Sequence, residues 1–132
     1  MKTFTRLFTL LVIAALSNFA NAQTYDLNAI GVSTVSNGLE VPVEYPIIMT
    51  LNFENADTTD IPAGAQALVF FLNGTDTINS FVGTFTNGFS AGASTTVISD
   101  YFTLPATPTN VTLCGGIFLL SGESDTTNNL AC

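Results

Sequence analysis

Short apolar runs rich in Val, Ile, Phe and Thr recur along the chain at spacings of roughly 8 to 12 residues, separated by clusters of Asn, Gly, Asp and Pro. This pattern is typical of all-β sandwiches and barrels, and no helical periodicity competes with it. Asn-Gly pairs at 37–38, 73–74 and 87–88 and Ser-Gly at 121–122 mark turns. The predicted strands are 25–33, 40–43, 47–54, 66–73, 77–85, 95–102, 110–120 and a short final strand at 130–132.

The segment 47–54 shows the clearest alternation of apolar and polar residues. Because successive side chains of a strand point to opposite faces, we expect Met49, Leu51 and Phe53 to point into the core and the polar residues between them to point outward. The chain has neither an internal repeat nor a linker, so we expect one domain at 23–132.

Residues 1–22 have the pattern of a secretory signal peptide. A start containing Lys2 and Arg6 precedes an apolar run at 7–16, and Ala20-Asn21-Ala22 follows as a cleavage site. A membrane anchor is the alternative, but a span needs about 20 apolar residues. We therefore expect a secreted protein, extracellular or at the cell surface, with the periplasm as a further possible location.

Charge narrows the possible functions. The chain has ten Asp and Glu residues against two Lys and Arg, a formal net charge of -8, and it has no His. Both basic residues, Lys2 and Arg6, lie in the predicted signal peptide. A domain without cations cannot neutralise phosphates, so nucleic acid and anionic membrane surfaces are excluded as partners. Catalysis through imidazole, lysine or arginine is excluded as well, and we expect no enzyme.

The two cysteines, Cys114 and Cys132, lie at equal distances on either side of Glu123. If the loop 121–125 joins two antiparallel strands, the cysteines face each other at a non-hydrogen-bonded pair. An exported chain meets an oxidising environment in which disulfides persist, so we predict a disulfide between them. Two Cys without His make no zinc site.

Two predicted strands contain segments, 67–72 and 117–120, that are apolar on both faces. In an immunoglobulin-like sandwich they are the third and sixth strands, which are neighbours, so their outward residues form an apolar patch. A covering by loops, or a bulge at Gly115-Gly116, is the alternative. The predicted interaction patch is Val69, Phe71, Phe118 and Leu120. A shift of one residue gives the alternative set Leu68, Phe70 and Ile117.

Carboxylates and side-chain oxygens cluster in two loops, 54–60 and 123–129. Calcium takes six to eight oxygen ligands, so acidic loops at one end of a sandwich suit it. The metal-ligand candidates are Asp57, Asp60, Glu123 and Asp125. Solvated turns that cap strands are the alternative, and we expect no cofactor. The chain has no Trp, which leaves no aromatic platform for a sugar-cleaving site built on paired carboxylates.

From residue 25 to 132 the sequence resembles the bacterial cell-adhesion-related domain family (CARDB). The motifs that carry the resemblance are Asp26-Leu27, Leu51-Asn52-Phe53-Glu54-Asn55 followed by Ile61-Pro62-Ala63-Gly64, and Ser124-Asp125-Thr126-Thr127-Asn128-Asn129. The resemblance implies an immunoglobulin-like antiparallel β-sandwich of about seven strands. It also implies an adhesive or spacer module of secreted and surface proteins, without a shared catalytic site.

The sequence departs from the family at its end, because Cys132 follows the Asn128-Asn129 turn by only three residues. A short final strand leaves unpaired backbone groups, which a partner or a second copy can pair by strand addition. The alternative is that the disulfide pins a short strand over a small gap. We expect a non-enzymatic protein of adhesion or surface assembly. The alternative is an extracellular module that binds glycan or calcium.

Overall fold

The computed structural model describes residues 24–34, 46–103 and 111–132. This part of the chain contains strands and no helix, so none of it forms a helix that spans a membrane, and the all-β prediction is confirmed. The predicted signal peptide at 1–22 and the predicted strand at 40–43 lie outside the described residues. The strands are β1 (Leu27–Thr34), β2 (Pro46–Ile47), β3 (Met49–Asn55), β4 (Gln66–Asn73), β5 (Asp76–Thr84), β6 (Ser94–Ile98), β7 (Phe102–Thr103), β8 (Leu113–Leu119) and β9 (Leu130–Ala131).

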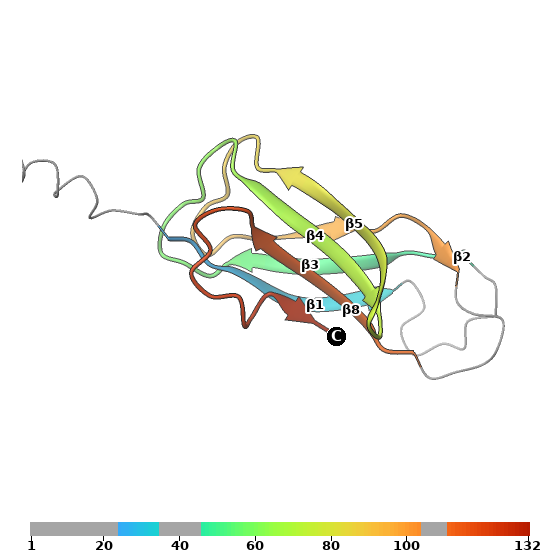
Figure 1. The fold of residues 1–132 in the computed structure, drawn as a ribbon. Helices are drawn as coiled ribbons and strands as arrows, with labels where there is room; N and C mark the ends of the chain where they lie inside the picture. Colours follow the sequence, from blue (N-terminus) through green and yellow to red (C-terminus); the bar gives the residue numbers. More distant parts are fainter. Residues whose placement is uncertain (1–23, 35–45, 104–110) are drawn as a thin grey trace, which may run out of the picture.

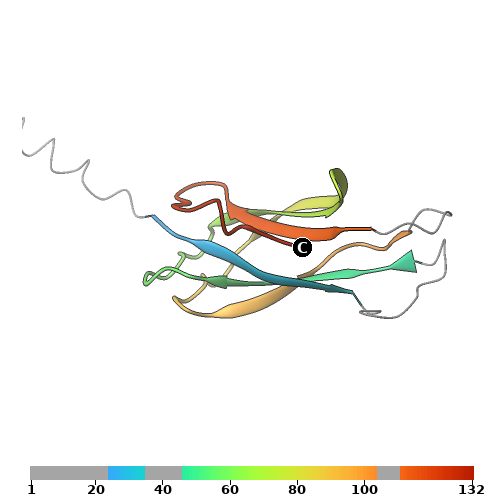
Figure 2. The same ribbon diagram turned by 90° about the horizontal axis from the view of Figure 1, so that it is seen from below.

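The strands form two packed antiparallel sheets. One has the order β1-β3-β6 and the other β5-β4-β8-β9, while β2 pairs only with β7. Ile48 alone separates β2 from β3, and residues 99–101 separate β6 from β7, so the β2–β7 pair continues the β3–β6 pair. The described strands therefore reduce to seven, with a final strand of two residues. Figures 1 and 2 show the two layers of this immunoglobulin-like sandwich.

Alternation along β3 builds the centre of the core, as predicted. Met49 and Leu51 are fully buried and Phe53 is 4% exposed, while the polar residues between them are only partly buried. From the opposite sheet, Phe71 and Ile117 complete the same apolar cluster. The core therefore lies between β3 of one sheet and β4 and β8 of the other.

The turn at Asn87-Gly88 sits directly against the β3–β4 connection. Gly88 has a φ of 76°, a conformation that L side chains rarely adopt, and an added Cβ would lie 2.8 Å from the carbonyl oxygen of Ile61. The next residue, Phe89, pairs with Ile61 through backbone hydrogen bonds in both directions. Glycine at this turn therefore lets the β5–β6 connection pack at one end of the sandwich.

Candidate interaction surface

The register between β4 and β8 decides which side chains leave the core. Val69 lies opposite Ile117, and these residues are 3% and 1% exposed. Leu68 lies opposite Phe118, one position along each strand, so both point away from the core. We give the name outer face to five apolar residues on this side of the four-stranded sheet: Leu68, Phe70, Val82, Phe118 and Leu120.

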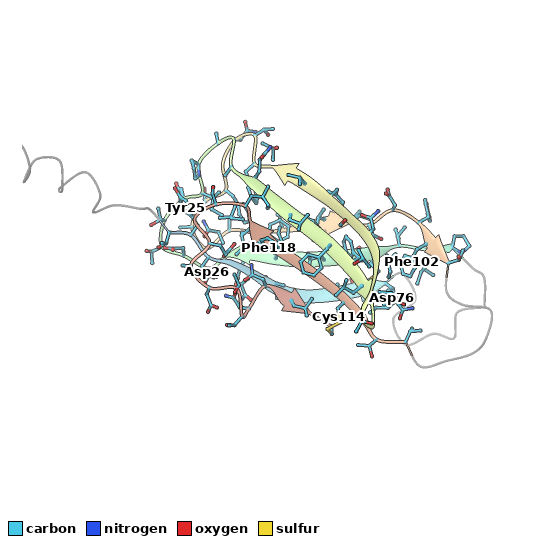
Figure 3. The ribbon with its side chains drawn as sticks, viewed as in Figure 1. Tyr25, Asp26, Asp76, Phe102, Cys114 and Phe118 are labelled. Atoms are coloured by element: carbon cyan, nitrogen blue, oxygen red, sulfur yellow. A yellow bond between two sulfur atoms is a disulfide. The ribbon has the colours of Figure 1, made fainter. Side chains whose placement is uncertain are left out.

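This arrangement corrects the predicted interaction patch for one of its two strands. Val69 and Phe71 are core residues, 3% and 0% exposed, so the prediction was wrong for β4. Phe118 and Leu120 of the same predicted patch do point outward, and Leu120 is 50% exposed. Figure 3 labels Phe118 on β8.

The alternative set was correct for two of its three residues. Leu68 and Phe70 point outward, whereas Ile117 is buried in the core. The register between β4 and β8 contains no shift at Gly115-Gly116, so a bulge does not turn β8 inward there. Because both faces of these two strands are apolar, the sequence contained no alternation from which to choose the outward set.

Gly116 lets an aromatic ring lie flat on the outer face. Phe70 is its direct neighbour on β4, and an added Cβ at Gly116 would overlap the Phe70 ring. The ring of Phe118 then meets that of Phe70 edge to face, with centroids 6.2 Å apart. Val82 extends the same surface onto β5, where it lies opposite Leu68 and is 51% exposed.

The outer face is also free of charge. The outward positions of β4 and β8 hold no acidic or basic residue, and the one titratable type among them, Cys114, is bonded in a disulfide. Among the described residues, only two carboxylates belong to strands: Glu54 in β3 of the other sheet and Asp76 at the first position of β5. The outer face is therefore a neutral surface on a domain whose other surfaces carry the carboxylates.

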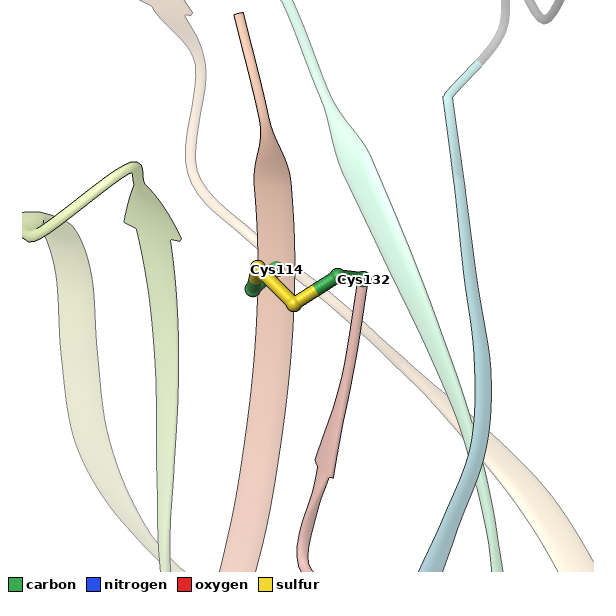
Figure 4. Close-up of a disulfide and its surroundings, with 2 residues drawn as sticks. All are labelled: Cys114 and Cys132. Atoms are coloured by element: carbon green, nitrogen blue, oxygen red, sulfur yellow. A yellow bond between two sulfur atoms is a disulfide. The ribbon is translucent and has the colours of Figure 1, made fainter.

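The predicted disulfide is present and fixes the final strand. Cys114 and Cys132 are bonded with their Cα atoms 4.0 Å apart, continuing the register in which Gly115 lies opposite Ala131 (Figure 4). The N–H of Ile117 donates to the carbonyl of Asn129 at 3.0 Å. Hydrogen-bonded and non-hydrogen-bonded pairs alternate along antiparallel strands, and the cysteines lie three pairs from Ile117 and Asn129. They therefore form a non-hydrogen-bonded pair, as the sequence predicted.

Glu123, one of the four predicted metal ligands, connects the two sheets instead. Its carboxylate accepts the N–H of Leu27 in β1 at 2.9 Å and the N–H of Leu119 in β8 at 2.7 Å. Burial raises the pKa of Glu123, and the two backbone hydrogen bonds oppose that rise. Nearby, the N–H of Ala29 donates to the carbonyl of Asn128, so the sandwich is closed on the β1 side.

The other three metal candidates accept hydrogen bonds from loop residues. Asp57 accepts hydrogen bonds from the next two backbone N–H groups, and Asp60 accepts the N–H of Ala91. Asp125 accepts the hydroxyl and the N–H of Thr127, and these bonds lower the pKa of Asp125. No three or more Asp, Glu, His or Cys side chains of the described residues form a group that could hold a metal ion.

A second feature, which the sequence did not predict, lies on the side away from β1. A cavity of about 160 Å³ opens between the sheets where β5 and β6 form their edges. Its floor includes Phe53, Val69 and Ile117 of the core, and its walls include Phe81 of β5 and Val97 of β6. We call this cavity the lateral groove. The groove depends on the strand register, because the register places small residues of separate strands next to each other.

Comparison of the chain with protein-family models, curated proteins and solved structures finds no match.

Proposed function

We propose that the chain is a secreted, non-enzymatic module that acts in adhesion or as an assembly subunit of a bacterial cell-surface structure, and that copies meet through the outer face. The observation that carries this proposal is the contiguous apolar and uncharged surface of Leu68, Phe70, Val82, Phe118 and Leu120. Exposed apolar patches rimmed by polar residues are typical of protein interaction sites.

Charge supports a contact between two copies through this face. Outside residues 1–22 the chain has ten carboxylates and no Lys, Arg or His, so two copies repel each other over most approaches. Contact through the outer face buries apolar side chains without bringing carboxylates directly together. The disulfide and the signal-like start at 1–22 support secretion, because disulfides persist in oxidising compartments.

The glycan- or calcium-binding alternative has less support. Each of its four candidate carboxylates accepts hydrogen bonds from the domain's own backbone. This alternative stays a prediction. Titration calorimetry with calcium and a thermal-shift screen of glycans can test it, because a bound ligand raises the melting temperature.

Two matched variants test the outer face. Leu120→Asp adds a carboxylate to the outer face at a residue that is 50% exposed. Ile98→Asp adds the same charge at a residue of β6 that is 55% exposed, on the opposite sheet. We expect static light scattering to show that association of the unmodified protein increases with salt, because salt screens carboxylate repulsion.

Leu120→Asp should abolish this association, and Ile98→Asp should retain it at high salt. Equal loss in both variants would mean that net charge, rather than the outer face, controls association. A protein that stays monomeric at high concentration and high salt would contradict assembly through this surface.

A further inference from the structure

The lateral groove results from a pair of small residues on the inner surface of the four-stranded sheet. Gly83 of β5 lies directly opposite Ala67 of β4, and Ala67 is 2% exposed, so both positions face the other sheet. No atom lies within 4 Å of the position that a Cβ would take at Gly83. The sheets therefore enclose a hollow where larger apolar side chains would normally meet.

Side-chain contacts lie beyond both ends of the stretch of β5 that lines the groove. On the side of Asn79, two residues before Phe81, the side-chain amide of Asn79 donates to Asp100, which follows β6, at 2.7 Å. At the other end the rings of Phe85 and Phe89 stack with centroids 5.3 Å apart, and both contact Phe53. An apolar hollow of about 160 Å³ has the size of cavities that take a benzene ring, so it suits one apolar side chain.

The edge beside the groove is suited to strand addition. β5 is the end strand of its sheet and has nine residues. Its sequence contains no Lys, Arg or Pro, the residues that usually block edge pairing. The pairing of β5 with β4 is regular from Asn79 to Thr84, and this stretch includes the groove residues Phe81 and Gly83.

The charges near β5 indicate which kind of segment can pair with this strand. Asp76 begins β5 and Asp100 accepts a hydrogen bond from Asn79 of β5, while the chain has no cation outside residues 1–22. A segment with basic residues beside its apolar anchor is complementary to this edge, whereas a second copy brings further carboxylates. In strand addition the backbone hydrogen bonds supply affinity and side-chain pockets supply specificity.

We propose that the lateral groove receives one apolar side chain from an extended, basic segment of another protein, which pairs with β5 as an additional strand. This contact is separate from the outer face and does not rest on the function proposed for that surface.

The probe is the synthetic peptide acetyl-Thr-Lys-Thr-Phe-Thr-Lys-Thr-amide, titrated into the isotope-labelled protein and followed by NMR. Its Phe and its two Lys residues alternate with Thr, so all three point to the same side of the extended peptide. We expect the methyl signals of Val69, Val97 and Ile117 to shift at millimolar peptide. Replacing Phe by Ala in the peptide should weaken binding by about tenfold or more, since the buried ring supplies the apolar contact.

Gly83→Val fills the groove and should weaken binding of the Phe peptide by about tenfold or more. Gly31→Val is the matched control, because Gly31 lies in β1 and also has no atom within 4 Å of an added Cβ. It should bind the peptide like the unmodified protein, and so should Leu120→Asp on the outer face. The last comparison separates this proposal from the outer-face proposal.

Three results would overturn the proposal. The first is the absence of shifts at millimolar peptide. The second is equal binding of the Phe and Ala peptides, or equal binding by the protein and its Gly83→Val variant. The third is that free benzene shifts the groove methyls while the peptide does not, which would make the groove a site for small apolar molecules.

Discussion

Replacing both Cys114 and Cys132 by alanine removes the cross-link that holds β9 on β8. The cysteines are 18 residues apart, and the loop-entropy relation assigns a loop of this length roughly 3 kcal/mol of stabilisation. We therefore expect the free energy of unfolding to fall by about 3 kcal/mol. With typical urea dependences for small domains, this lowers the urea midpoint by roughly 2 M.

Hydrogen exchange of two amides shows which part of the sheet opens first when the disulfide is removed. The N–H of Ile117 donates to Asn129 just before β9, whereas the N–H of Leu120 donates to Gln66, the first residue of β4. Because β9 pairs through only two residues, it should fray first without the disulfide. The ratio of the exchange rate of the Ile117 amide to that of the Leu120 amide should therefore be much higher in the alanine variant than in the unmodified protein. A loss of stability below about 1 kcal/mol with unchanged exchange at Ile117 would mean that the disulfide does not hold β9 on β8.

Other substitutions test individual contacts, each by urea unfolding. Glu123→Gln places an amide where the carboxylate accepts two backbone N–H groups, so it should cost about 1–3 kcal/mol. Burial raises the pKa of Glu123 in the folded protein above the ordinary 4.5, so the folded protein binds this proton more tightly than the unfolded chain does. Protonation of Glu123 therefore stabilises the fold at low pH, and this stabilisation is lost as the pH rises through the raised pKa. The unmodified protein should therefore gain stability relative to Glu123→Gln on acidification, and a constant difference would contradict this. Gly115→Val brings a Cβ within 2.7 Å of Val32, so it should lower the free energy of unfolding by roughly 1–3 kcal/mol. Gly83→Val fills the groove and should raise the free energy of unfolding by about 1 kcal/mol. A stabilising Gly115→Val and a destabilising Gly83→Val would contradict the packing at these two glycines.

The sequence predicted the features that depend on local pattern. Alternation in 47–54 identified Met49, Leu51 and Phe53 as core residues, because polar residues stand between them. The symmetric spacing of Cys114 and Cys132 about a turn predicted their register and disulfide. In both cases the positions of residues along one hairpin or one strand were enough.

Features that depend on pairing between distant strands were not predictable in this way. Val69 and Phe71 were placed outward because β4 is apolar on both faces, so only its pairing with β5 and β8 reveals the outward set. The lateral groove arises where Gly83 lies opposite Ala67, and neither residue is informative alone. The contacts of Glu123, a metal-ligand candidate from the sequence, were not predictable either, because a sequence does not show which backbone N–H groups surround a carboxylate.

Contact between copies of the domain through the outer face can be mapped residue by residue in solution. The measurement is the change of amide chemical shifts over a range of protein concentrations at high salt. We predict that the shifts that change with concentration map to Leu68, Phe70, Val82, Phe118 and Leu120 and their strand neighbours, while the β1-β3-β6 sheet stays constant. Changes confined to the β1-β3-β6 sheet, or no change at any concentration, would contradict contact through the outer face.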